Sequence, residues 1–196
     1  KIWSGSNVCR YSICDSQMIE FKCSPIPTGM GLFFGGYMNN GHFYFLTDQY
    51  FIDFPDQYLM QNKERVNGEV HERPCFYAFE DSSHKGLFWL VPFSSQTNKF
   101  QAIYNTKVQK YHKCDTIVFG DVLGKRKAFL IQNMCPATSK YIHNEYLDSA
   151  SNIPVRVNGT LEKEIITKAK KVLALQRQGK KLIFPDIKKI ESELIK

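Results

Sequence analysis

The strongest pattern of apolar and polar positions is an apolar run followed by a helical repeat. The run, 87–91, predicts a buried strand that ends at the next proline. Ser94 and Ser95 follow, and apolar side chains then recur at the spacing of one helix face, which predicts a helix over about 96–112. The serines have two interpretations. They cap the helix, or they present hydroxyls to a phosphate at its N-terminus, with Lys99 about one turn further on.

The remaining pattern predicts short strands first and helices last. Apolar runs bounded by proline, glycine and polar turns predict five further strands, at 43–46, 75–79, 115–122, 127–132 and 153–157. We expect a short helix at 49–54, a charged loop at 56–72, a strand break at Pro136, and two closing helices from Thr160 and Pro185. This order predicts an α+β fold, with a compact, strongly bent antiparallel sheet or barrel decorated by helices and a C-terminal helix pair.

Two of these strands should form a hairpin that brings candidate site residues together. The polar turn 80–86 joins the strands on either side of it, so we expect Pro74 to lie opposite Pro92. His71, before the first strand, and Ser95, after the second, would then meet at the same end of the sheet.

Composition narrows the classes of function. The 196 residues are 43% hydrophobic and 23% charged, which is typical of one globular domain, and no apolar run is long enough for a membrane-spanning helix. The formal charge of +7 favours an anionic partner, nucleic acid above all, although a solvated surface also explains it. The six cysteines lack zinc-site spacing and no signal peptide is apparent, so we expect a reducing, cytoplasmic setting.

Residues 1–37 differ in composition and pattern from the sequence that follows. They contain three of the six cysteines and show no sustained periodicity. They end in Gly35-Gly36-Tyr37 before Met38, and codons for these residues can spell a ribosome-binding site ahead of a start codon. We therefore expect a translated leader, with 38–196 as a single domain; the alternative is a genuine N-terminal extension.

Three groups of residues resemble a known family. They are Phe43-Tyr44-x-Leu46 with Tyr50 and Phe54, Arg73-Pro74 ahead of a strand, and Leu90-Val91-Pro92-Phe93-Ser94-Ser95 with a downstream lysine. These residues resemble the ToxN/AbiQ family, the endoribonuclease toxins of type III toxin–antitoxin systems. Residues 71–136 are most similar to the CptN branch, and the resemblance covers about 38–196.

The resemblance implies a fold similar to that of MazF-type toxins and an endoribonuclease that needs no metal or other cofactor. Cleavage by the ribose 2′-hydroxyl would leave a 2′,3′-cyclic phosphate. The implied partners are target mRNA and a pseudoknotted antitoxin RNA, which the toxin processes and binds in a closed protein–RNA ring, in antiviral defence by abortive infection. The alternative is a protein that binds structured RNA without cleaving it.

In the family, the site lies just before the second strand and at the serine corner. Some relatives have a lysine after the proline and a tyrosine three residues before it, where this chain has Cys75 and His71. Histidine suits proton transfer because its ordinary pKa is about 6.5. We expect four catalytic residues, without assigning base and acid: His71, Ser94, Ser95 and Lys99. We expect RNA contacts from a further set, each otherwise a surface charge or a core ring: Lys63, Arg65, Arg73, Phe93, Lys125, Arg126 and Arg156.

Overall fold

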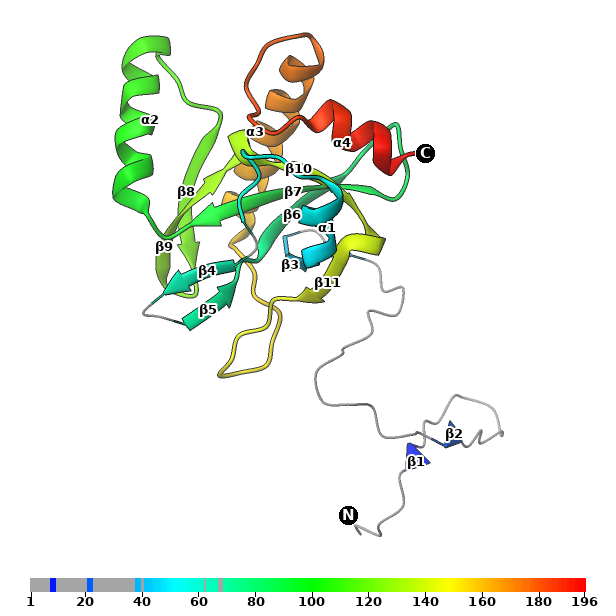
Figure 1. Ribbon diagram of the computed structural model, residues 1–196. Helices are drawn as coiled ribbons and strands as arrows, with labels where there is room; N and C mark the ends of the chain where they lie inside the picture. The colour runs from blue at the N-terminus through cyan, green and yellow to red at the C-terminus, as the bar shows by residue number, and fades with distance from the viewer. Residues whose placement is uncertain (1–7, 10–20, 23–37, 40, 62, 67–68) are drawn as a thin grey trace. The chain divides into compact units, whose positions relative to one another are not determined.

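The computed structural model describes residues 8–9, 21–22, 38–39, 41–61, 63–66 and 69–196 (Figure 1). Within these ranges, the side chains of 8–9, 21–22, 64–66 and 69–71 lie outside the description. The chain divides into two compact units, residues 1–32 and 33–196. In the first unit, β1 (Val8–Cys9) pairs antiparallel with β2 (Phe21–Lys22). The predicted leader, residues 1–37, falls mostly outside the described residues.

The second unit is α+β, built on a seven-stranded antiparallel sheet. Six strands follow the order β11 (Ile142–Glu145), β3 (Phe43–Leu46), β6 (Cys75–Glu80), β7 (Leu87–Ser94), β9 (Lys125–Leu130) and β8 (Ile117–Val122). The seventh, β10 (Cys135–Thr138), also pairs with β7. The predicted α+β class is confirmed, but the sheet stays open, so a closed barrel is wrong.

The long central strand β7 explains the bend of the sheet. One edge of β7 pairs with β6, while the other edge pairs first with β10 and then, at its end, with β9. Between β9 and β10 the chain bends through a short 3-10 helix, η1 (Ile131–Asn133). Pro136 was expected to break a strand but lies inside β10, opposite Trp89. Proline is tolerated there because β10 pairs with β7 alone among the described strands, as an edge strand does.

The β6–β7 hairpin forms as predicted, with a different register. Cys75, rather than Pro74, lies opposite Pro92. The register shifts by one residue between Tyr77 and Phe79, which is a β-bulge at Ala78. The extra residue moves every pair beyond the bulge by one position relative to a regular hairpin.

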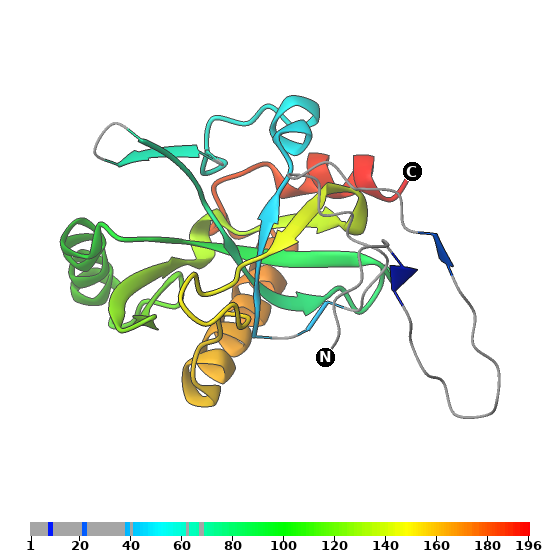
Figure 2. The same cartoon turned by 90° about the horizontal axis from the view of Figure 1, so that it is seen from below.

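The helices cover both faces of the sheet. In Figure 2, α3 (Gly159–Arg177, orange) lies on one side, and α1 (Asp48–Asp53) and α4 (Ile187–Leu194, red) lie on the other. Buried side chains of α3 join Phe76, Val91 and Phe129 in one core, whereas Tyr50 of α1 and Ile190 of α4 join a second core with Tyr44 and Leu90. Helices therefore lie at 159–177 and 187–194, but each packs on the sheet, and the predicted C-terminal helix pair is not confirmed.

The third core lies beneath α2 (Thr97–Tyr111), the helix predicted at 96–112. Phe100 of α2 packs there with Ile117 and Leu130. The residue that precedes this helix is Gln96, and it makes no capping hydrogen bond, so neither predicted serine is the N-cap. No helix among the described residues has both the length and the apolar character needed to cross a membrane.

Three further expectations need correction. The loop predicted at 56–72 contains a hairpin of β4 (Lys63–Val66) and β5 (Glu69–Glu72). The strand predicted at 153–157 is reduced to isolated bridges, Leu147 with Pro154 and His42 with Arg156. The cap of α3 is Asn158, whose side chain accepts the Leu161 amide, and not Thr160. Asparagine is a stronger N-cap residue than threonine, because its side-chain oxygen readily accepts a free amide of the first helical turn, and this favours Asn158.

Candidate active site

A pocket of about 370 Å³ lies at the open end of the β6–β7 hairpin. It collects residues from four parts of the chain that are distant in sequence. Its lining comprises Glu72, Arg73 and Pro74 before β6, Phe93 and Ser95 at the end of β7, Val122, Leu123, Lys125 and Lys127 from the β8–β9 hairpin, and Tyr146 after β11. The lining thus has three cationic side chains and one carboxylate. We call it the Ser95 pocket.

The β8–β9 turn places two lysines on one side of the pocket. Leu123 and Gly124 both have positive φ, 49° and 69°, which is the geometry of the tight hairpin turns that match strand twist. Side chains alternate along the strand that follows, so Lys125 and Lys127 share a face. Arg126 lies between them on the opposite face, with its guanidinium 5.1 Å from the centroid of the Phe119 ring. Leucine rarely adopts positive φ, and strained backbone of this kind gathers at functional sites.

A polar contact across the Ser95 pocket joins Lys127 and Ser95. The Lys127 Nζ donates to the Ser95 Oγ at 2.6 Å, and the same ammonium lies 5.9 Å from the centroid of the Phe93 ring. An ammonium and a hydroxyl held together can both donate to a single anionic oxygen. This pair therefore forms a donor site on the wall of the pocket.

The neighbouring serine has a different environment. Ser94 is buried, and its Oγ accepts the backbone N–H of Gln96 at 3.2 Å. Ser95 is exposed and contributes to the pocket lining. A hydroxyl that accepts an amide two residues later stabilises a local turn. The structure therefore separates the serine pair into one that shapes the corner and one that faces the pocket.

Arg73 and two aromatic rings complete the wall. Arg73 is half-buried, and its Nη1 lies 3.6 Å from the Met60 sulfur. The rings of Phe93 and Tyr146 both pack edge-to-face on Phe43, with centroid distances of 5.3 and 6.3 Å. Such packing fixes the orientation of the rings. The Ser95 pocket therefore combines fixed cations with an aromatic surface.

Cys75, which replaces a lysine found in some relatives of the resembled family, lies away from this chemistry. Its thiol is buried in the core that contains Tyr44 and Tyr77. Burial, with a further contribution from Cys135, raises the pKa of the Cys75 thiol far above its ordinary value. The thiol therefore stays protonated and cannot act as a base at neutral pH.

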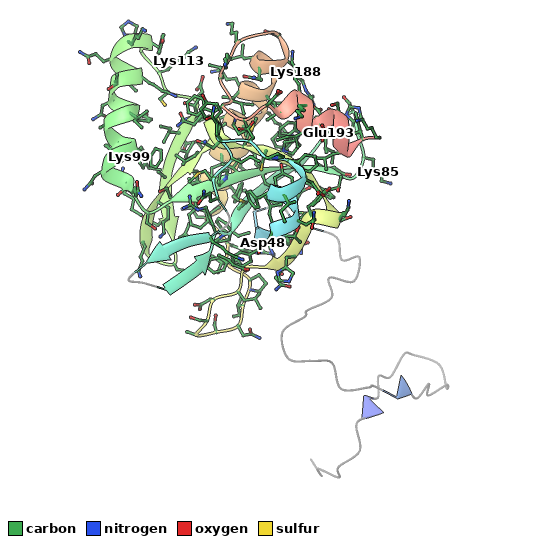
Figure 3. The ribbon with its side chains drawn as sticks, viewed as in Figure 1. Asp48, Lys85, Lys99, Lys113, Lys188 and Glu193 are labelled. Carbon is green, nitrogen blue, oxygen red and sulfur yellow. The ribbon has the colours of Figure 1, made fainter. Side chains whose placement is uncertain are left out.

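Several predicted residues lie outside the Ser95 pocket. Lys99 is exposed on α2 with its ammonium near the Phe100 ring, and Figure 3 shows it on the outer side of that helix. Lys63 forms an ion pair with Asp48, and the exposed Arg156 belongs to a backbone bridge with His42.

The two remaining predicted residues, His71 and Arg65, belong to the β4–β5 hairpin. In the backbone register, His71 lies opposite Glu64 and Arg65 opposite Val70, while both side chains fall outside the described part of the chain. The backbone of His71 immediately precedes Glu72, which lines the pocket. Its place in the sequence therefore keeps it next to the site.

Sequence reasoning missed three lining side chains, Lys127, Glu72 and Tyr146. Lys127 had a usable signal, because alternation along a predicted strand puts it on the face of Lys125. Tyr146 had none, since it reaches the pocket through the pairing of β11 with β3. No protein-family model matches this chain. No curated protein sequence matches it either. The chemistry of the Ser95 pocket is therefore the main ground for assigning a function.

Proposed function

We propose that this protein is a metal-independent endoribonuclease whose active site is the Ser95 pocket. The 2′-hydroxyl of a ribose attacks the adjacent phosphorus, the bond from phosphorus to the 5′-oxygen breaks, and a 2′,3′-cyclic phosphate and a 5′-hydroxyl result. The observation that carries the proposal is the contact of the Lys127 ammonium with the Ser95 hydroxyl, in a pocket that also contains Arg73 and Lys125.

The reaction needs donors to the charge that develops on the phosphate oxygens. Lys127 and Ser95 supply two such donors at one point of the wall, held in place before substrate arrives. Fixed donors of this kind are usually the largest single contribution to catalysis. Arg73 and Lys125 would bind the scissile or the flanking phosphates, because guanidinium and ammonium groups neutralise phosphate charge.

The reaction also needs a base for the 2′-hydroxyl and an acid for the 5′-oxygen. Glu72 is the one carboxylate in the described lining, and His71 is its neighbour in β5. We propose that Glu72 transfers one of the protons and, on the resemblance alone, that His71 transfers the other, because a histidine suits either role near neutral pH. Tyr146, which is half-buried, would hold a base of the substrate by stacking, as aromatic side chains do in single-stranded RNA recognition, whereas Phe93 is buried in the core and supports the wall of the pocket.

The resemblance to the ToxN/AbiQ toxins, and to their CptN branch, adds a biological setting to this proposal. In that setting the protein acts in the cytoplasm on mRNA, and a pseudoknotted antitoxin RNA neutralises it within a closed protein–RNA ring. The seven-stranded antiparallel sheet with helices on both faces is the observation that supports a fold of the MazF type in this proposal. The formal charge of +7 supports an RNA partner.

A second candidate is a protein that binds structured RNA without cleaving it. It is favoured by one observation: among the described side chains of the lining, none is an imidazole. The test is incubation of a 5′-labelled RNA in EDTA. The proposal predicts fragments whose 3′ ends resist phosphatase until acid opens the cyclic phosphate, and Ser95→Ala should abolish them. If the wild type and Ser95→Ala both bind the RNA tightly and leave it intact, the second candidate is favoured.

A further inference from the structure

A second pocket, of about 440 Å³, lies at the junction of α3 and α4. Its lining includes Tyr58, Gln176, Lys181, Phe184 and Lys188. The volume falls within the range of small-molecule pockets, about 300–1,000 Å³. In Figure 1 the junction lies at the top of the domain, whereas the β4–β5 hairpin beside the Ser95 pocket lies at the bottom. We call this second cavity the Phe184 pocket.

The backbone around Phe184 is held firmly. The Gln176 Oε1 accepts the amides of Leu182 and Ile183, at 2.7 and 3.0 Å. The Phe184 amide then donates to the carbonyl of Gln132 at 2.8 Å. The loop is thus fixed from both α3 and η1, and the direction of the Phe184 side chain follows from this backbone.

The fixed loop turns an aromatic ring towards solvent. Phe184 is 41% exposed, while its neighbours Ile183 and Ile187 are buried. The Tyr58 ring, itself 50% exposed, lies beside it with a centroid distance of 6.1 Å. The ammonium of Lys107 lies 5.9 Å from the Phe184 centroid. Single exposed apolar residues are ordinary, but here the Phe184 ring on the fixed loop has a second exposed ring beside it, so it offers a face on which a base can stack.

The lining of the Phe184 pocket contains two lysines and two aspartates, which differ in the partners they have. Lys181 and Lys188 are exposed, and neither has an ion pair among the described residues; Figure 3 shows Lys188 beside the α3–α4 junction. The two lining carboxylates are used by the backbone. Asp56 accepts the amides of Tyr58 and Asp186, both at 2.7 Å, and Asp186 caps α4. The lining thus has no net formal charge, and a phosphate would be bound by two lysines that have no ion pair among the described residues, not by an excess of positive charge.

We propose that the Phe184 pocket is a second binding site for single-stranded RNA. One base stacks on Phe184, beside the Tyr58 ring, which is inclined to it by 50°, and the phosphates on either side of that base pair with Lys181 and Lys188. Aromatic faces combined with cations are the usual composition of single-strand binding sites. The choice of RNA as ligand rests on the proposed ribonuclease function. The site itself is separate from the Ser95 pocket and would anchor a strand that extends beyond the point of cleavage.

The test is a fluorescence-anisotropy titration with a 5′-fluorescein 20-nucleotide RNA of mixed sequence, fully 2′-O-methylated so that it cannot be cleaved. Phe184→Ala should weaken binding between about 5-fold and 150-fold, as loss of one stacked base does. Phe184→Leu keeps apolar bulk without a ring face and should also weaken it. The matched control is Tyr111→Ala at the end of α2, which removes a ring that is 58% exposed and lies near Lys110; its affinity should stay that of the wild type.

Unchanged affinity in Phe184→Ala would overturn the proposal, and so would an equal loss in Tyr111→Ala. A second measurement locates the strand directly. RNA that carries 5-iodouridine, irradiated in the complex, should crosslink to the peptide containing Phe184 or to that containing Tyr58, and crosslinks confined to other peptides would contradict the assignment. Both readouts use binding alone. A failure of the ribonuclease proposal would appear instead as wild-type protein that leaves unmodified RNA intact.

Discussion

The two ends of the β6–β7 hairpin carry clusters of charged side chains that differ in their balance. At the turn end, Asp81 is buried and fully partnered. Its Oδ2 accepts the indole N–H of Trp89 at 2.9 Å and the Arg177 Nη2 at 2.7 Å, and its Oδ1 accepts the amide of Ser83 at 2.9 Å. At the open end, the Ser95 pocket holds three cationic side chains and one carboxylate.

The turn end has the features of a structural cluster. Arg177 also donates to Glu191 at 2.6 Å, which connects α3, α4 and the hairpin turn. Burial alone would raise the pKa of Asp81, but the hydrogen bonds from Trp89, Ser83 and Arg177 outweigh it and lower the pKa to about 2. The carboxylate is therefore stabilised as an anion by the fold.

The open end lacks this balance, and the difference separates a cluster that stabilises the fold from one that can bind a ligand. Among its described lining residues, three cationic side chains and one carboxylate lie exposed or half-buried around a pocket. An excess of positive charge attracts anions, and the attraction to a phosphate strengthens when the phosphate displaces water from the pocket. We therefore expect opposite effects at the two ends. Substitutions at the turn end should lower the stability of the fold, and substitutions at the open end should lower RNA cleavage.

The largest expected effect on stability is that of Asp81→Ala. It leaves the Trp89 indole N–H and the Arg177 guanidinium without their buried acceptor, which should lower the free energy of unfolding by about 3–5 kcal/mol. Cleavage per folded molecule should not change. Urea denaturation measures the first quantity. Glu164→Ala, which removes an exposed helix ion pair with Lys168, is the control and should cost about 0.5 kcal/mol or less.

The two serines at the open end should separate activity from stability. Ser95→Ala should lower the single-turnover cleavage rate by about 10²–10³-fold, the cost of one lost donor to a developing anion, with little effect on stability. Ser94→Ala should cost about 1 kcal/mol of stability, through the lost bond to the Gln96 amide, and should leave the rate intact. Equal rates for the two variants would exclude Ser95 from the site.

The stability of the fold should also depend on pH, because Asp81 must stay ionised to keep its partners. Its pKa is about 2 when folded and 3.8 as its ordinary value, so its contribution is complete above about pH 4 and is lost as pH falls towards 2. A difference of this size corresponds to about 2 kcal/mol. Denaturation of the wild type and of Asp81→Ala between pH 5 and pH 2 measures it. A loss just as steep in the variant would show that other groups are responsible.

The smallest predicted effect is on the salt dependence of RNA binding. Lys125→Gln should flatten the slope of log K against log salt by about 0.7, the value for one phosphate contact on a single strand. Lys85→Gln removes a charge from the turn end of the same hairpin, where Figure 3 places it, and should leave the slope unchanged. An equal change in both would mean that the charge acts through the whole surface.

Local patterns predicted much of this fold. The apolar run of β7, the repeat of α2 and the turn between β6 and β7 all follow from periodicity and breakers. The grouping of Arg73, Phe93 and Ser95 around one pocket follows from hairpin pairing, which brings the start of one strand to the end of the next.

The remaining features depend on contacts that a single pattern does not encode. The bulge at Ala78 reflects how the hairpin packs on both cores, since Ala78 and Phe79 join one core and Tyr77 the other. The sequence pattern places Asp81 in a turn and does not indicate its role, because its partner Arg177 lies 96 positions away. The β4–β5 hairpin was the avoidable miss, because Asn67-Gly68 is a strong two-residue hairpin signal.

The most direct test of the open-end active site compares adjacent residues of β9. Lys127 donates to Ser95 in the pocket, whereas Arg126 lies on Phe119 on the opposite face. Single-turnover cleavage of one labelled RNA in EDTA, with enzyme in saturating excess, should fall about 10²–10³-fold in Lys127→Ala and stay within about twofold of wild type in Arg126→Ala. Equal rates in the two variants, whether both lost or both retained, would contradict the assignment of the Ser95 pocket as the active site.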